Sequence, residues 1–201
     1  MAGTFFHLAH KPHVLARLTQ EIRGKFTTEE EIRTGPELNS CEFLQACINE
    51  TLRLAPSVST TIPRTVLQGG IVIDQEFIPE GTMVGTTTYA IQRNPNYFAA
   101  PDEFRPKRWI VDAETGVDEE SIEIAKQAFC PFSVGARSCV GWKLAWTELN
   151  LAVARTLFRF DMRLAPDARC CGGEREDCDF RLKGWVTSAV EGPWVQFRER
   201  C

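Results

Sequence analysis

One short segment in the second half of the chain combines residue types that suit metal chemistry. It reads Phe132-Ser133-Val134-Gly135-Ala136-Arg137-Ser138-Cys139-Val140-Gly141 and leads directly into a long helical pattern. A cysteine at a helix N-terminus and close to an arginine has its thiolate stabilised by the helix dipole and by the positive charge, and the thiolate is the form that ligates a metal. Gly135 and Gly141 would let the backbone approach a flat, bulky ligand. The alternative interpretation is a buried structural cysteine in a glycine turn.

A second feature is a pair of opposite charges in a helix whose other residues suggest burial. Glu50 and Arg53 stand three residues apart, so their side chains lie on one helix face. An isolated pair of this kind is usually a surface ion pair of small energetic value. A buried pair must be hydrogen-bonded, and the later segment Phe104-Arg105-Pro106-Lys107-Arg108-Trp109 could supply a further donor.

At Phe132 to Gly141 the sequence resembles the cytochrome P450 family of haem-thiolate monooxygenases, whose cysteine loop has the pattern Phe-x-x-Gly-x-Arg-x-Cys-x-Gly. Every fixed position of the pattern is present, including Gly141. The resemblance implies haem as the cofactor, with Cys139 as the axial ligand of the iron, Arg137 paired with a haem propionate and Phe132 packed beside the thiolate. Arg64 stands where the family commonly has another propionate-binding arginine. A thiolate ligand pushes electron density toward the iron, which favours cleavage of the O–O bond.

The resemblance also gives Glu50, Arg53 and Arg108 a structural role. In the family, the arginine of the Phe-x-Pro-x-Arg-Trp segment completes a triad with the Glu-x-x-Arg pair, and we expect a bidentate arginine on each side of the carboxylate to lock the β meander against the helix. Two positions depart from the family pattern: Lys107 replaces a common glutamate, and Gln92 replaces a common histidine. Neither is expected to touch the iron.

The pattern of apolar residues predicts a mainly α fold with a small β meander and a C-terminal hairpin, an α+β class. Helices are expected at residues 4–10, at 13–26, from Asn39 or Ser40 to just before Pro56, and at 141–158. Strands are expected at 60–66, 71–73 and 82–88, which would form the meander, and at 185–190 and 194–197, which would form the hairpin. The family motifs occur in order, so residues 1–201 are expected to be a single partial domain, the C-terminal portion of the cytochrome P450 fold.

Composition excludes several classes of partner and site. The chain has 201 residues and a formal net charge of -4, without a dense stripe of Lys and Arg, so nucleic acid is not an expected partner. Negative charge gathers in residues 112–123, which we expect to form a solvated loop or short helix. No apolar run is long enough to span a membrane. The 8 cysteines are irregularly spaced with no signal peptide before them, so most are expected to be reduced thiols.

Two other residue groups could attract a metal, but the spacing favours neither. The run of His7, His10 and His13 is broken by Pro12 and has no well-placed carboxylate. The late cysteines lack paired zinc-site spacing; they are Cys170, Cys171, Cys178 and Cys201. A structural or solvent-exposed role is the better interpretation of both groups.

Two functions follow from the resemblance. The first is a haem-thiolate monooxygenase that inserts one oxygen atom of O2 into a small organic substrate, in secondary-metabolite biosynthesis as in the fungal members that the chain most resembles. A separate NADPH-dependent reductase would supply electrons and could dock on a basic patch that includes Lys143, Arg105 and Lys107. The second is a truncated, catalytically inactive haem-binding or interaction fragment. We expect the N-terminal half to be absent, with the acid and threonine pair of the distal helix, so no catalytic residue is assigned.

The expected location follows from the same family. Complete relatives are usually anchored to the endoplasmic reticulum, whereas this chain shows no anchor of its own. An intracellular location without an anchor is therefore expected.

Overall fold

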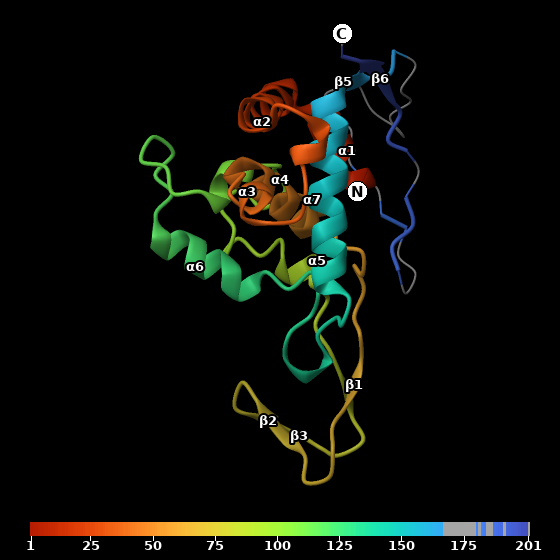
Figure 1. Ribbon diagram of the computed structural model, residues 1–201. Coiled ribbons are helices and arrows are strands. Elements are labelled where there is room, and N and C mark those ends of the chain that lie inside the picture. The colour runs from red at the N-terminus through yellow and green to blue at the C-terminus, as the bar shows by residue number, and fades with distance from the viewer. Residues whose placement is uncertain (167–179, 181, 184–186, 191, 201) are drawn as a thin grey trace.

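The computed structural model describes residues 1–166, 180, 182–183, 187–190 and 192–200, which form a helical body with three small sheets (Figure 1). The α-helices are α1 (Ala2–His10), α2 (Pro12–Lys25), α3 (Pro36–Asn39), α4 (Glu42–Leu54), α5 (Thr88–Ile91), α6 (Glu119–Ala128) and α7 (Trp142–Arg159). The 3-10 helices are η1 (Glu29–Glu31), η2 (Pro106–Trp109) and η3 (Gly135–Arg137). The strands are β1 (Arg64–Thr65), β2 (Ile71–Ile73), β3 (Glu76–Ile78), β4 (Met83–Val84), β5 (Phe160–Leu164) and β6 (Val195–Glu199).

Helices α1, α2, α4 and α7 surround one apolar core, and they match the helices predicted from the sequence. Helix α2 buries Val14, Leu18 and Ile22, which recur every four residues and so share one face. Pro12 starts this helix at a position where its missing N–H costs nothing. Burial of each such side chain stabilises the fold by about 1.5–3 kcal/mol. The core therefore fixes α4 and α7, the helices on which the candidate site depends.

Two predicted boundaries differ from the structure. Helix α4 begins at Glu42 with Cys41 as its N-cap, because Asn39 belongs to the separate short helix α3. The acidic segment is part loop and part helix, since α6 starts after Asp118, whose side chain accepts a hydrogen bond of 2.8 Å from the backbone N–H of Ser121.

The predicted three-stranded meander is wrong, because the strands form two separate antiparallel pairs. Strand β1 pairs with β4, and β2 pairs with β3 inside that connection. Asp74 and Gln75 have φ values of 50° and 70°, so they form a tight two-residue turn that sends the chain straight back as β3. The predicted strand 82–88 is consequently shortened to β4, and Thr88 already starts α5.

The predicted C-terminal hairpin is also wrong in its pairing. Strand β6 pairs with β5, in the register Met162 opposite Phe197. Strand β5 follows α7 directly and buries Met162 against the core, which gives it a fixed position that a surface hairpin lacks. Of the predicted partner strand 185–190, residues 185–186 lie outside the described part of the chain, and Ala189 forms an isolated bridge with Lys183.

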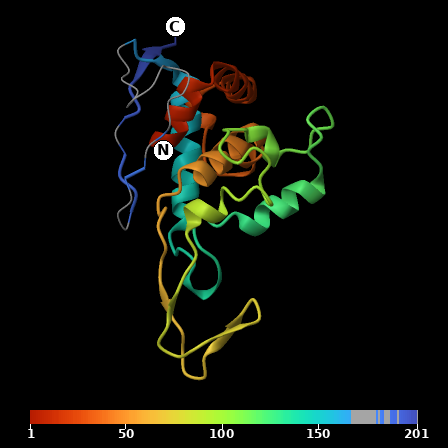
Figure 2. The same ribbon diagram turned by 180° about the vertical axis from the view of Figure 1, so that it is seen from behind.

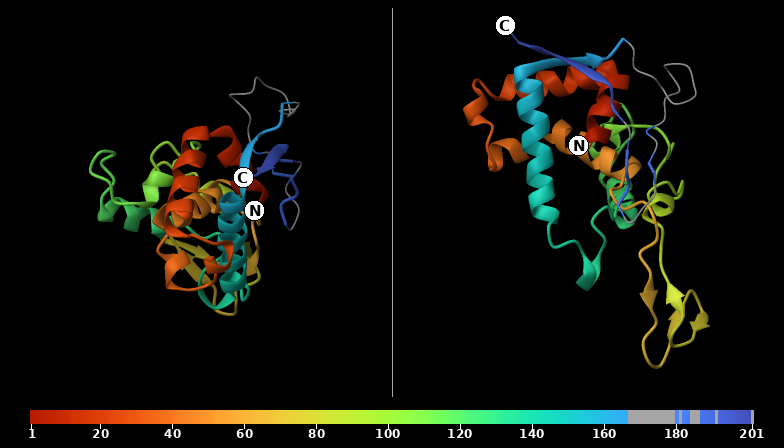
Figure 3. Two further views of the ribbon diagram at one scale, coloured as in Figure 1. Left: turned by 45° about the horizontal axis from the view of Figure 1, so that its top comes forward. Right: turned by 90° about the vertical axis from the view of Figure 1, so that its right-hand side faces the viewer.

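The long helix α7 separates two ends of the molecule. Its N-terminus continues from the cysteine-containing loop, and strands β1 to β4 extend from the same end of the helical body (Figures 1 and 2). Strands β5 and β6 lie at the opposite end (Figure 3). Within the described residues, no helix is long and apolar enough to cross a membrane.

Candidate functional site

Glu50 and Arg53 form a fully buried ion pair on α4, with 0% exposure of either side chain. Arg53 donates from Nε to Oε2 of Glu50 and from Nη2 to Oε1, both at 2.9 Å. This bidentate geometry compensates part of the cost of removing both charges from water. The pair is therefore a built feature of the interior, and the surface alternative is excluded.

The carboxylate of Glu50 also collects donors from the segment that contains η2. Its Oε1 accepts from the backbone N–H of Arg105 at 2.8 Å and from Nε of Arg108 at 3.0 Å. Its Oε2 accepts from Nε1 of Trp109 at 3.0 Å. Burial lowers the pKa of Arg108, and the charge of Glu50 opposes that shift. One carboxylate thus fastens η2 to α4.

The remaining donors of the two arginines bind backbone carbonyls. Arg53 donates to the carbonyl groups of Gln92, Pro101 and Glu103. Arg108 contacts Glu50 only through Nε, because Nη1 and Nη2 donate to the carbonyls of residues 99 and 100. The expected bidentate contact from Arg108 is therefore wrong, and the cluster fastens segment 99–109, rather than the β strands, to α4.

Gln92 is a connecting residue that the sequence did not reveal. It is fully buried, and its Nε2 donates to the carbonyls of Leu52 and Arg53 at 3.1 and 3.0 Å, two groups at the C-terminus of α4 that lack partners in the helix. Its Oε1 accepts from the backbone N–H of Cys130 at 3.0 Å. Gln92 therefore connects the buried triad to the residue that begins the cysteine loop. A polar residue between Ile91 and Arg93 carried no sequence signal of burial.

The cysteine loop, residues 130–141, crosses back on itself before α7. The backbone N–H of Cys139 donates to the carbonyl of Phe132 at 2.8 Å, and that of Ser138 donates to Gly135 at 3.0 Å. Ser133 and Gly135 have φ values of 61° and 74°, a left-handed conformation that Gly135 adopts without strain. Phe132 packs against the main core. The loop therefore presents Cys139 just before Gly141, the N-cap of α7.

Cys139 is exposed, so it is not the buried structural cysteine that the alternative required. Large apolar side chains near it in the loop and in the first turn of α7 are exposed as well: Val134 by 72%, Val140 fully and Leu144 by 64%. Monomeric proteins rarely leave such a cluster uncovered without a ligand or partner.

The two expected anion-binding arginines lie free of the triad. Arg64, in β1, donates from Nη1 to the carbonyl of Pro63 at 3.1 Å. Arg137, in η3, is exposed and makes no hydrogen bond or ion pair with any described residue. The structure brings Phe132, Cys139 and Gly141 together, and a Cβ on Gly141 would lie 3.9 Å from Sγ of Cys139. An exposed thiol in a loop with exposed apolar side chains, and with Arg137 two residues before it, fits a flat apolar group that carries carboxylates.

The alternative metal groups receive no support from the described residues, which contain no cluster of three or more candidate ligands. The ring of His7 stacks on Phe104 at 4.4 Å, and Nδ1 of His10 bonds the carbonyl of Phe6. Burial lowers the pKa of His7 to about 3. The four late cysteines lie outside the described residues.

Comparison with known proteins gives a consistent result. The family model described as cytochrome P450 matches residues 1–174. The chain is 41% identical to "Cytochrome P450 monooxygenase AKT7" of Alternaria alternata, over 99% of this chain and 40% of that protein. It is 38% identical to "Cytochrome P450 monooxygenase atnE" of Emericella nidulans, over 100% of this chain and 38% of that protein. It is 39% identical to "Cytochrome P450 monooxygenase apf8" of Gibberella fujikuroi, over 100% of this chain and 55% of that protein. The chain thus spans about two fifths to one half of the length of these relatives.

Proposed function

Because this chain belongs to the cytochrome P450 family, we propose that it supplies the thiolate side of the haem site of a monooxygenase. The reaction is the insertion of one oxygen atom of O2 into a small organic substrate, with electrons from a separate NADPH-dependent reductase. The names of the fungal relatives support a monooxygenase, and secondary-metabolite biosynthesis is the proposed setting.

In this proposal three residues of the cysteine loop, and Arg64 of β1, have defined tasks. Cys139 ligates the iron, Arg137 and Arg64 hold the propionates, and Phe132 packs beside the sulfur. Haem with a thiolate ligand, when bound, supplies the chemistry that cleaves O2. The buried triad of Glu50, Arg53 and Arg108 takes no part in that chemistry. It holds α4 and segment 99–109 together, and Gln92 extends that support to the loop.

The observation that carries the proposal is the exposed sulfur of Cys139. It lies on a loop closed by the Cys139 to Phe132 hydrogen bond, and the same loop and the first turn of α7 carry exposed apolar side chains. A structural thiol would be buried, as Cys41 and Cys47 are. Burial raises the pKa of the Cys41 thiol to about 11 and that of Cys47 well above its ordinary value, so both stay neutral.

The test is the absorption spectrum of the chain reconstituted with haem, reduced and exposed to carbon monoxide. We expect the Soret band that is characteristic of thiolate ligation, and we expect Cys139→Ser to remove it. Cys130→Ser is the matched control, because this half-buried thiol lies in the same loop. A wild-type spectrum without the thiolate band, or a band that survives in Cys139→Ser, would refute the assignment.

The reductase is proposed to approach the cysteine loop through Lys143. This residue is exposed in the first turn of α7, and its Nζ lies 5.5 Å from the centre of the Trp142 ring. Arg105 and Lys107 belong to segment 99–109 and already face carboxylates, at 3.9 Å from Glu103 and 2.9 Å from Asp112. Lys143→Glu should slow reduction of the haem protein by its reductase, whereas Lys126→Glu on α6 should not. Equal rates would contradict this docking site.

A further inference from the structure

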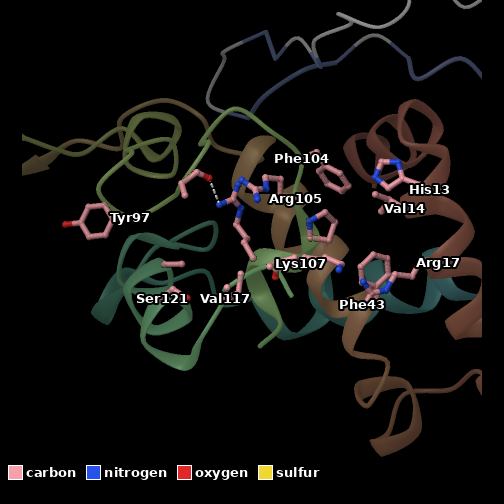
Figure 4. Close-up of a pocket in the computed structure, with 16 residues that line it drawn as sticks. His13, Val14, Arg17, Phe43, Tyr97, Phe104, Arg105, Lys107, Val117 and Ser121 are labelled. Carbon is pink, nitrogen blue, oxygen red and sulfur yellow. Dashed lines mark hydrogen bonds between the residues drawn. The ribbon is translucent and has the colours of Figure 1, made fainter. Parts of the chain in front are cut away.

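A cavity of about 430 Å³ lies between α2, α4, η2 and α6 (Figure 4). In Figure 4, His13, Arg17, Phe43 and Phe104 lie along one side of it, and Tyr97 and Ser121 along the other. No residue of the cysteine loop lines this cavity. It is therefore separate from the site proposed for haem, and its volume is in the range that small-molecule sites occupy.

The floor of the cavity is apolar. Val14, Phe43, Phe104 and Pro106 line it and are buried. A floor of this kind favours a ligand with an apolar, preferably aromatic, body.

The charge of the cavity is one-sided. Four cationic side chains line it and no aspartate or glutamate does so among the described residues, although the chain as a whole has a net charge of -4. The four are Arg17, Arg105, Lys107 and Arg108. Low-dielectric walls lined by one sign of charge concentrate the field inside a cleft, so this cavity attracts anions.

The four cations differ in how far their charge is already compensated. Arg108 binds Glu50, and Lys107 binds Asp112 at 2.9 Å. Arg105 lies 3.9 Å from Glu103, a long ion pair between exposed side chains. Arg17 forms no ion pair or hydrogen bond with any described residue, and its guanidinium lies 4.1 Å from the centre of the Phe43 ring. Arg17 is thus the cation best able to bind an incoming anion, directly above the aromatic floor.

We propose that this cavity binds a small aromatic carboxylate. The aromatic ring occupies the apolar part of the cavity, and Arg17, whose guanidinium covers the Phe43 ring, binds the carboxylate, while Arg105 adds positive potential. Inorganic phosphate would leave the apolar floor uncovered, and a neutral aromatic compound would leave Arg17 unpaired. The proposal is independent of haem, because it uses no residue of the cysteine loop.

The test uses 2-naphthoate as the probe and 2-naphthalenemethanol as its neutral counterpart, with affinity measured by calorimetry on the full chain. We expect the neutral compound to bind about threefold more weakly, because it cannot pair with the guanidinium of Arg17, and an ion pair at an exposed residue contributes modestly to affinity. Arg17→Gln should weaken 2-naphthoate to a similar degree. Lys126→Gln, which removes the same charge from an exposed residue outside the cavity, should leave its affinity unchanged.

Two further measurements locate the probe. Ala99→Trp, at an exposed residue of the lining, fills the cavity without changing a charge and should abolish binding. In methyl NMR spectra, 2-naphthoate should shift the signals of Val14 and Val117, which line the cavity, more than those of Val134 and Val140 in the cysteine loop. Absent binding, equal affinity for the two probes, equal effects of the two charge variants, or larger shifts at Val134 and Val140 would overturn the proposal.

Discussion

The buried triad and the cysteine loop use their polar atoms in opposite ways. Around Glu50 and Arg53 the side chains are fully buried, and each N–H of the Arg53 guanidinium has an acceptor. In the loop, Cys139 and Arg137 are exposed, and their side chains form no hydrogen bond or ion pair with any described residue. Buried polar groups whose hydrogen bonds are all made hold the surrounding segments rigidly. Exposed polar groups without a protein partner remain able to bind a ligand. The buried triad therefore serves stability, and the residues of the cysteine loop remain available for binding.

The largest loss of unfolding free energy is expected from a substitution of Glu50 in the buried triad. Glu50→Gln removes the negative charge and leaves Arg53 buried without a counter-ion, which costs about 3–5 kcal/mol of unfolding free energy. Urea denaturation measures that loss. The exposed Glu148, on α7, provides the control: Glu148→Gln should change the unfolding free energy by less than about 0.5 kcal/mol. Similar costs for the two variants would contradict the buried geometry.

A smaller loss of unfolding free energy, confined to the surroundings of the cysteine loop, is expected from a substitution of Gln92. Gln92→Leu leaves the carbonyls of Leu52 and Arg53 and the N–H of Cys130 unpaired, at a cost of about 2–3 kcal/mol. Hydrogen exchange should then speed up at the amides of Cys130 and Cys139 more than at those of α7. Asn150→Leu is the control, since it removes a buried amide that bonds Gln45 and Trp146 instead. Equal exchange profiles would show that Gln92 does not support the loop.

The next effect is a pH dependence at His7. Burial holds the pKa of His7 at about 3 in the folded chain, whereas the unfolded chain has an ordinary histidine. The unfolded state therefore binds a proton below about pH 6.5, whereas the folded state binds it only near pH 3. The unfolding free energy consequently decreases as the pH is lowered through that window. Between about pH 6.5 and pH 5 the expected loss is at most about 2 kcal/mol. His7→Phe should reduce the pH slope of the denaturation midpoint, and an unchanged slope would refute the prediction.

The smallest effect on stability is expected at the loop. Cys139→Ala should change the unfolding free energy by less than about 0.5 kcal/mol, because the side chain is exposed. The same denaturation experiment measures it. A loss comparable to that of Gln92→Leu would mean that Cys139 is a structural residue after all.

The sequence predicted correctly those elements whose structure depends on residues close together in the chain. Spacing of apolar residues was sufficient for α2, α4 and α7, because an amphipathic helix carries its own signal. The cysteine loop was found because its residue types are unusual together. The burial of Gln92 was missed, since it depends on contacts with α4 and with Cys130 that are distant in sequence.

The strand pairings were missed for a related reason. The turn at Asp74 and Gln75 adopts left-handed backbone angles that its residue types do not announce as clearly as Asn-Gly would. Strand β5 follows α7 without a glycine or proline to mark the change, and its partner β6 is more than thirty residues away in the chain. The pairing of strands that are distant in sequence depends on how the core assembles, and the spacing of apolar residues along the chain does not describe that assembly.

The most direct test of the proposed haem site is X-ray absorption at the iron edge of the haem-reconstituted chain. We expect one sulfur atom in the first coordination shell of iron in the wild type and in Cys130→Ser, and none in Cys139→Ser. A first shell without sulfur in the wild type, or one that keeps its sulfur in Cys139→Ser, would contradict the assignment of Cys139 as the ligand.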